Sequence, residues 1–141
     1  LIADLYAVEN AKEQIERTLE EFSLTEKRRT LAKRLSGGQL KRLSIALAVI
    51  TSPKILFLDE PTLGLDVKAR GALWKTIENL KGKTSIFLTT HYLEEVERLT
   101  DRIGIISKGK LKAVGTLEEL LEKTGKTTLE DAFLSLEEGE E

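Results

Sequence analysis

Cysteine and methionine are both missing from this sequence of 141 residues. The absence of cysteine excludes disulfide bonds, thiolate metal sites and a cysteine nucleophile, and it is compatible with a reducing cytosol. A natural translation product normally begins with methionine, whereas this chain opens on Leu1. We therefore expect the sequence to be an excised portion of a longer polypeptide.

Long hydrophobic runs are missing as well. The longest apolar stretch covers residues 43–50 and is interrupted by Ser44, whereas a membrane-spanning helix needs about 20 apolar residues. We therefore expect no direct membrane insertion, so that any role at a membrane depends on a partner. With 33 % charged and 40 % apolar residues, the composition is typical of a soluble domain with one core.

The sequence has no excess of basic charge, because its net charge is −2. One basic cluster still suggests a nucleic-acid interaction, and its members are Lys27, Arg28, Arg29, Lys33, Arg34, Lys41 and Arg42. No aromatic residue is interleaved with this cluster, although base stacking on aromatic rings is a common means of binding single strands. We therefore expect a solvated face and no nucleic-acid partner.

A phosphate-binding loop of the form G-x-x-x-x-G-K-[ST] is the absence with the largest consequence. Residues 82–84 and 125–127 both read Gly-Lys-Thr, but Ile77 and Leu120 occupy the positions that require the earlier glycine. Such a loop must also leave a strand and open a helix, whereas residues 82–84 lead into the apolar run 85–88. Neither segment is therefore expected to bind phosphate.

The apolar pattern of residues 1–53 predicts a helical subdomain. Apolar residues recur at helical spacing at Val8, Ala11, Ile15, Leu19 and Phe22. A second helix is expected to begin after Ser36, where the sequence fits a capping box, and to stop before Pro53.

Residues 54–141 predict an α/β arrangement. Apolar runs at 55–58, 85–89 and 102–106 alternate with helices near 68–80 and 93–99, which is typical of a mostly parallel sheet with covering helices. The turn Lys108-Gly109 and the run 110–114 predict an antiparallel edge hairpin. A helix capped by Thr116 and Glu119 and ending at Gly125, a helix at 129–136 and an acidic tail at 137–141 follow.

Two acids follow the first of these strands. A run of four apolar residues is expected to be buried on both faces, so Asp59 lies at the carboxyl edge of the sheet, where α/β folds bind ligands. There Asp59 could bind Mg²⁺, which keeps most of its waters and needs few protein ligands. Glu60 is expected to point the opposite way and could orient or deprotonate an attacking water. The alternative is that the pair only terminates the strand.

A glycine-rich helix start lies upstream, in Ser36, Gly37, Gly38 and Gln39. Capping alone could explain the serine and the glutamine. Two glycines in a first turn cost on the order of 1 kcal/mol each relative to alanine, so they suggest that another group approaches the backbone. Because a helix N-terminus offers unpaired amides and about half a positive charge, we expect a phosphate here, with Ser36 adding a hydroxyl donor.

Two single residues complete the candidate set. His91 is the only histidine, and it follows the strand that ends near Thr89, which places it at the same predicted edge as Asp59 and Glu60. There it could hydrogen-bond a terminal phosphate or the attacking water, although a lone histidine is more often a filler. Asp66 is expected to cap the helix that follows it.

Together these motifs resemble the ATP-binding-cassette (ABC) transporter ATPases. Residues 35–39 resemble their signature motif, 55–59 their Walker B strand and 64–66 their D-loop, while Glu60 resembles the catalytic glutamate and His91 the switch histidine. Segments 101–116 and 128–133 are similar to subunits of the multidrug or ABC-2 type. The resemblance covers nearly the whole chain, although Leu63 and Val67 depart from the usual D-loop pattern.

The resemblance implies a partial P-loop NTPase fold that uses ATP and Mg²⁺ and energises transport through transmembrane permease subunits. In this family two ATPase subunits dimerise head to tail, and the signature motif of one closes over ATP held by the Walker A loop of the other. Ser36, Gly37, Gly38, Gln39 and Asp66 would contribute to that contact. The isolated chain is expected to be catalytically incomplete, and to be cytoplasmic and peripheral to the membrane through its permease partner.

Two alternatives remain open. The first is a chromosome-maintenance ATPase of the SMC type, although its long coiled coils would need three to four heptads where this chain shows about two. The second is a non-catalytic interaction module that retains the motifs for docking.

Overall fold

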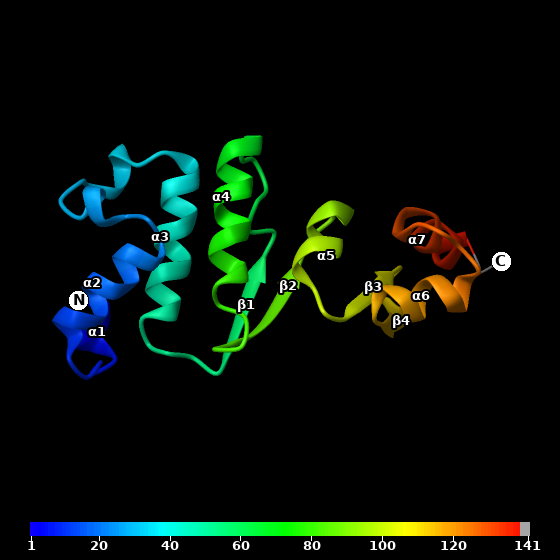
Figure 1. The fold of residues 1–141 in the computed structure, drawn as a ribbon, viewed down its shortest axis with the longest axis horizontal. Helices are drawn as coiled ribbons and strands as arrows, with labels where there is room; N and C mark the ends of the chain where they lie inside the picture. The colour runs from blue at the N-terminus through cyan, green and yellow to red at the C-terminus, as the bar shows by residue number, and fades with distance from the viewer. Residues whose placement is uncertain (139–141) are drawn as a thin grey trace. The chain divides into compact units, whose positions relative to one another are not determined.

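The computed structural model describes residues 1–138, and the chain divides into two compact units, Leu1–Thr89 and Thr90–Glu141 (Figure 1). The expected α/β class is confirmed, because a parallel strand pair and an antiparallel hairpin are both present. The expected boundary between residues 53 and 54 lies inside the first unit and stays a prediction about subdomains. Within residues 1–138, no helix has both the length and the hydrophobicity to cross a bilayer.

Helices dominate the start of the first unit, which contains α1 (Ile2–Leu5), α2 (Ala11–Glu21), the 3-10 turns η1 (Thr25–Lys27) and η2 (Ala32–Arg34), and α3 (Gly37–Val49). The predicted amphipathic helix is confirmed as α2, and Phe22 directly after it is fully buried. Val8 lies outside this helix, because Ala7 and Asn10 adopt positive φ angles of 49° and 50° that interrupt it. The short α1 was not predicted.

The rest of the first unit contains β1 (Ile55–Asp59), α4 (Val67–Glu78) and β2 (Ser85–Thr89). The two strands pair in parallel, with Asp59 opposite Thr89 at their carboxyl ends. Helices α3 and α4 run side by side in this unit (Figure 1). Large apolar side chains from these helices and strands form its core, including Ile45, Leu56, Leu58, Leu73, Trp74 and Ile77.

Strand β1 is covered on one face only, so the expectation that it is buried on both faces is wrong. Leu56 and Leu58 are buried, whereas Ile55 and Phe57 are 52 % and 74 % exposed. On the open face the ring of Phe57 stacks on that of Phe87, with the ring centroids 5.3 Å apart. The apolar run therefore predicts the strand correctly, but it does not predict how many faces of the strand are covered by other elements.

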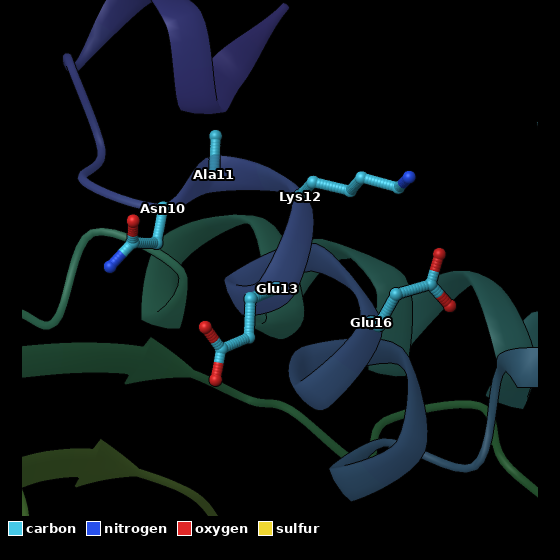
Figure 2. A pocket seen from close by; sticks show the side chains of 5 residues that line it. All are labelled: Asn10, Ala11, Lys12, Glu13 and Glu16. Atoms are coloured by element: carbon cyan, nitrogen blue, oxygen red, sulfur yellow. The ribbon is translucent and has the colours of Figure 1, made fainter.

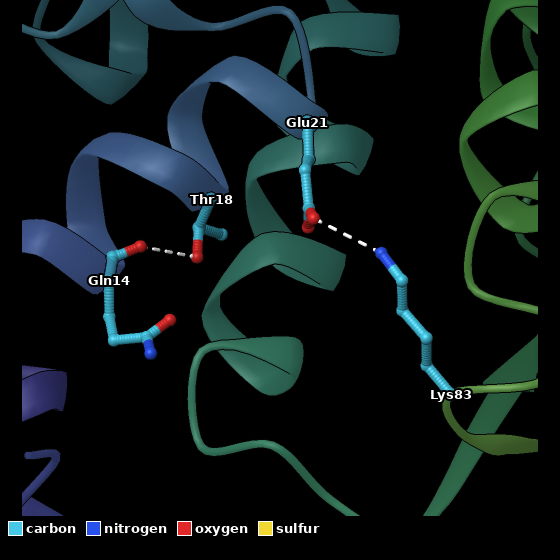
Figure 3. A network of polar contacts seen from close by, with 4 residues as sticks. All are labelled: Gln14, Thr18, Glu21 and Lys83. Atoms are coloured by element: carbon cyan, nitrogen blue, oxygen red, sulfur yellow. Dashed lines mark hydrogen bonds and ion pairs between the residues drawn. The ribbon is translucent and has the colours of Figure 1, made fainter.

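Polar contacts join the loop before β2 to the helical part of the first unit. Lys83 Nζ lies 3.2 Å from Glu21 Oε1 on α2, and Thr18 on the same helix donates to the carbonyl of Gln14 (Figure 3).

The two Gly-Lys-Thr segments lie in turns. Gly82 has φ of 78° in a turn that leads to a strand, and Gly125 has φ of 65° at the end of a helix. Residues 82–84 lead into β2, as predicted, and residues 125–127 follow the end of α6. The expectation that neither segment binds phosphate stays a prediction.

The second unit contains α5 (Leu93–Leu99), β3 (Ile103–Ser107), β4 (Lys110–Gly115), α6 (Leu117–Thr124) and α7 (Leu129–Glu138). Strands β3 and β4 form the expected antiparallel hairpin, with a register shift at Ile105/Ile106. Its core contains Ile103, Ile105, Ala113, Leu120 and Leu129. The predicted acidic tail begins too early, because Glu137 belongs to α7. Its last residues, 139–141, lie outside the described residues.

Candidate functional site

The turn that opens α3 forms the predicted capping box. Ser36 Oγ accepts the Gln39 N–H at 3.3 Å, and Gln39 Oε1 accepts the Ser36 N–H at 3.0 Å. Helix geometry leaves the first-turn amides of Gly37 and Gly38 without intrahelical acceptors. The first turn also contains no acidic residue, so nothing in it neutralises the positive end of the helix dipole. This helix start therefore suits an external anion.

The two glycines of this turn have different surroundings. A Cβ atom built on Gly38 would lie only 2.9 Å from the Cβ of Ala69 on α4, whereas one built on Gly37 would meet Leu65 Cδ2 at 3.8 Å. The first distance is a steric clash and the second is an ordinary contact. The argument that both glycines are needed for a phosphate is thus corrected: packing of α3 against α4 by itself requires glycine at position 38.

The two acids at the carboxyl end of β1 contact Thr89 on the neighbouring strand. Asp59 is exposed, and its Oδ1 accepts a short hydrogen bond from the Thr89 hydroxyl. The Glu60 N–H donates to the Thr89 carbonyl at 3.0 Å. Sequence reasoning missed Thr89, although its position at the end of the adjacent parallel strand was a usable signal.

Glu60 has a left-handed backbone, with φ of 44°. The expectation that strand alternation sets its direction is wrong, because the residue lies past the end of β1. Non-glycine residues with positive φ concentrate in turns and at functional sites, where surrounding contacts hold the strained conformation. The bond to Thr89 is one such contact, and the half-buried side chain of Glu60 stays a predicted catalytic group.

The donor set at the strand end fits Mg²⁺. Among residues 1–138, no three His, Cys, Asp or Glu side chains gather closely enough to form a metal cage. Mg²⁺ does not require such a cage, since it commonly binds one or two carboxylates together with phosphate oxygens and water. Asp59 is an exposed carboxylate oriented by the Thr89 hydroxyl, which suits this mode of binding.

Asp66 caps α4 as predicted, because its Oδ1 accepts the Ala69 N–H at 2.8 Å. Gly64 precedes it with φ of 77°, a conformation that glycine adopts without strain. Residues 64–66 thus lead directly into the part of α4 that meets the turn at Gly38. A contribution of Asp66 to nucleotide binding stays a prediction.

His91 belongs to the second unit, where its side chain is exposed. Its ring centroid lies 4.2 Å from that of Tyr92. The Tyr92 N–H donates to the hydroxyl of Thr90, which orders the backbone beside the histidine. The predicted role of His91 at the phosphate stays a prediction.

The basic cluster is partly used inside the first unit. Arg28 forms an ion pair with Glu16 on α2, and Arg42 donates to the carbonyl of Phe22. The basic residues of the cluster that lie in the 3-10 turns are exposed, namely Lys27, Lys33 and Arg34. These contacts fit the solvated face predicted for the cluster, and the absence of a nucleic-acid partner stays a prediction.

A hollow of about 550 Å³ lies at the start of α2. Its lining residues are Asn10, Ala11, Lys12, Glu13 and Glu16 (Figure 2). None of the candidate residues lines this hollow.

Acids at the carboxyl end of β1 in a parallel strand pair, with a glycine-rich helix start in the same unit, are typical of α/β folds that bind ligands at a sheet edge. Residues 2–63 match the ABC transporter family. The chain is also similar to a solved ATP-binding subunit of an ABC transporter, with a TM-score of 0.81 and 30 % identity over 96 % of this chain and 59 % of that one. Residues 2–63 therefore belong to the ABC transporter family, and the chain as a whole is similar to ATP-binding subunits of ABC transporters.

Two curated relatives show the range of this similarity. The daunorubicin resistance ATP-binding protein DrrA3 of Streptomyces coeruleorubidus is 42 % identical over 116 residues, which are 82 % of this chain and 37 % of that protein. The phospholipid-transporting ATPase ABCA3 of Rattus norvegicus is 38 % identical over 84 % of this chain and 7 % of its own length. The chain thus spans about a third of DrrA3 and a much smaller part of ABCA3.

Proposed function

We propose that this chain supplies the signature motif and Walker B part of an ABC subunit that hydrolyses ATP to energise transport. The observation that carries this proposal is the arrangement of the first unit. The N-terminus of α3, which has no acidic residue in its first turn, packs beside α4, which Asp66 caps. In the same unit, β1 of the parallel strand pair leads to Asp59 and Glu60. The match of residues 2–63 to the ABC transporter family supports it.

The signature turn contacts the terminal phosphate of ATP that a second subunit holds head to tail. The Ser36 hydroxyl and the amides of Gly37 and Gly38 donate to phosphate oxygens, as helix N-termini do in other phosphate sites. Gln39 has a different task, because its side-chain oxygen already accepts the Ser36 N–H. It holds the Ser36 backbone in place and so acts as a positioning residue.

The strand-end acids act on the nucleotide held by their own subunit. Asp59, oriented by Thr89, would hold Mg²⁺, which supplies neutralising charge to the phosphates when bound. Glu60 accepts a proton from the attacking water as general base. His91 donates a hydrogen bond to the terminal phosphate or holds the water. The phosphate loop comes from outside residues 1–141.

The proposed partners are a second ATPase subunit and transmembrane permease subunits. They would hold the chain at the cytoplasmic face of a membrane as a peripheral component. The names of the relatives refer to daunorubicin resistance and to phospholipid transport. Because these roles differ, the shared activity we propose is the ATP-driven step.

The proposal is tested by trapping radiolabelled MgATP with the chain, in the presence and absence of an ABC subunit that contains a complete phosphate loop. We expect trapping only in the mixture, and no turnover by the isolated chain. When a segment joined to this chain supplies the phosphate loop within the same subunit, Glu60→Gln should abolish turnover, while the exposed Glu20→Gln serves as the matched control.

Three results would contradict the proposal. Turnover by the pure chain that disappears with Glu60→Gln would show that the site is complete on its own. Equal trapping with and without this chain in the mixture would favour a non-catalytic interaction module. Retention on duplex DNA at physiological salt would favour the SMC-type alternative, since that binding depends on phosphate contacts.

A further inference from the structure

We propose that Ala69 is a positioning residue that fixes the signature turn against α4, so that residues 36–38 and Asp66 form one rigid body. Ala69 makes no predicted contact with nucleotide, and its influence is exerted through Gly38. The packing itself stands on the geometry of the first unit alone. Its consequence for ATP rests on the proposed function.

The first observation is the closeness of the two helix starts. Gly38 is buried, and a Cβ atom built on it would lie 2.9 Å from Ala69 Cβ and 3.8 Å from Ala69 Cα. These atoms belong to the backbone or attach directly to it, so no flexible side-chain end can move away. The helices have approached as far as a glycine and an alanine permit, and any added methyl group must separate them.

The second observation is that caps hold both sides of this contact. On α4, Asp66 Oδ1 accepts the Ala69 N–H at 2.8 Å. On α3, Ser36 and Gln39 exchange the two hydrogen bonds of the capping box. Each residue in contact therefore lies in a capped first turn, where fraying is suppressed.

The third observation is a second contact beside the first. A Cβ built on Gly37 would be 3.8 Å from Leu65 Cδ2, so the Leu65 side chain lies next to the turn without excluding a methyl group. The Ser36 hydroxyl and the Asp66 carboxylate thus belong to two turns held by adjacent contacts. A displacement of one turn is transmitted to the other because closely packed interfaces deform little.

A size swap tests the contact. Gly38→Ala should lower the unfolding midpoint of the first unit, Ala69→Gly should leave room for the added methyl, and the double variant should recover most of the loss. The only tryptophan, Trp74, is buried in α4, so its fluorescence reports this unit. Gly71→Ala is the matched control, because no atom lies within 4 Å of a Cβ built there.

Amide hydrogen exchange supplies a readout that a general loss of stability would not reproduce. In Gly38→Ala, exchange should rise together at residues 36–39 and 66–69, more than in the rest of the first unit, and the double variant should reverse both. Gly37→Ala should leave both segments protected. Exchange that rises at residues 36–39 alone would overturn the rigid-body proposal.

Trapping of MgATP with a subunit that contains a phosphate loop separates this proposal from the proposed function. Gly38→Ala should weaken trapping roughly tenfold, since overpacking of this size shifts equilibria by about that factor, and the double variant should restore it. If the unchanged chain traps no ATP, the proposed function fails while the size swap still decides the packing. If Gly38→Ala does not fold, a folded double variant supports the proposal and an unfolded one overturns it.

Discussion

Helices α3 and α6 begin with the same hydrogen-bonded device in two different units. Ser36 and Gln39 exchange bonds of 3.3 and 3.0 Å at α3, and Thr116 and Glu119 exchange bonds of 3.2 and 2.9 Å at α6. In each case the first residue caps the helix and the third helical residue reaches back to it. The two starts therefore have nearly the same local geometry.

They differ in charge and in side-chain size. The first turn of α6 contains Glu118 and Glu119, whereas that of α3 contains no acid and two glycines. At α6, the carboxylate of Glu118 accepts hydrogen bonds from the Glu118 backbone N–H and from the Thr116 hydroxyl. These two bonds hold the pKa of Glu118 below its ordinary value. That shift is the response expected of a carboxylate at a positive helix end.

The comparison teaches what distinguishes a structural helix start from a candidate binding site. Helix α6 neutralises its own positive end, and so it needs no ligand. Helix α3 omits this stabilisation, because Gly38 and Gln39 stand where α6 has Glu118 and Glu119. A capping box alone does not separate the two cases, whereas the residues between its ends do.

The largest effect is expected from giving α3 the charge of α6. Gly37→Glu should fold, because the nearest atom to a Cβ at this position is 3.8 Å away. Repulsion between its carboxylate and the phosphates should weaken MgATP trapping by about two orders of magnitude or more. Gly37→Gln is the neutral control of nearly the same size. Equal weakening by both variants would mean that size, and not charge, is responsible.

A smaller effect is expected from adding a methyl group beside each capping box. Gly38→Ala should cost about 1–3 kcal/mol of stability, since Ala69 cannot move away. A Cβ on Gly115 would lie 2.8 Å from Glu119 Oε2 and 3.1 Å from Glu119 Cβ. The carboxylate can swing aside and the second contact needs only a small shift, so Gly115→Ala should cost about one hydrogen bond, roughly 1 kcal/mol. Trp74 fluorescence follows the first change and circular dichroism the second. A larger cost at Gly115 would reverse this ranking.

Removing the capping hydroxyls should affect the two helices about equally. Ser36→Ala and Thr116→Ala should each cost about 1 kcal/mol, the typical loss for an N-cap. Denaturant titration measures both variants. Only Ser36→Ala should also weaken ATP trapping, and a similar loss of trapping with Thr116→Ala would remove the functional distinction between the two helix starts.

The smallest effect is expected at Glu118. Because its pKa is lower in the folded chain than its ordinary value of 4.5, the charged carboxylate stabilises α6 above that pH. The stabilisation is lost as the pH falls below 4.5 and through the folded pKa. Glu118→Gln should remove this part of the pH dependence, measured by melting at neutral and acidic pH. No change in pH dependence would show that the N-terminus of α6 does not favour the anion.

Local signals in the sequence predicted much of this structure. Both capping boxes are read from residues three apart, and the strand Ser85–Thr89 and the helix Leu93–Leu99 agree with their predicted bounds. Asp59 and Asp66 occupy the strand end and the helix cap expected of them. Each of these features depends on interactions within a few residues of chain.

The missed features depend on residues far apart in the chain or on unusual backbone angles. Nothing near Gly38 in the sequence indicates that Ala69 will lie against it, and the contact of Asp59 with Thr89 depends on the register of two strands that are 30 residues apart. The open face of β1 depends on what covers the strand, which an apolar run does not encode. The left-handed turn at Glu60 could not be anticipated, because glutamate rarely adopts it.

The stacked rings of Phe57 and Phe87 have a consequence for work with the isolated chain. Two large aromatic side chains that are 74 % and 61 % exposed on a narrow strand pair form an adhesive surface in concentrated solution. The apparent molecular mass from light scattering should therefore increase with protein concentration, under conditions where the chain is still folded. Measurements on the variants above should therefore use dilute samples, in which self-association through these rings is rare.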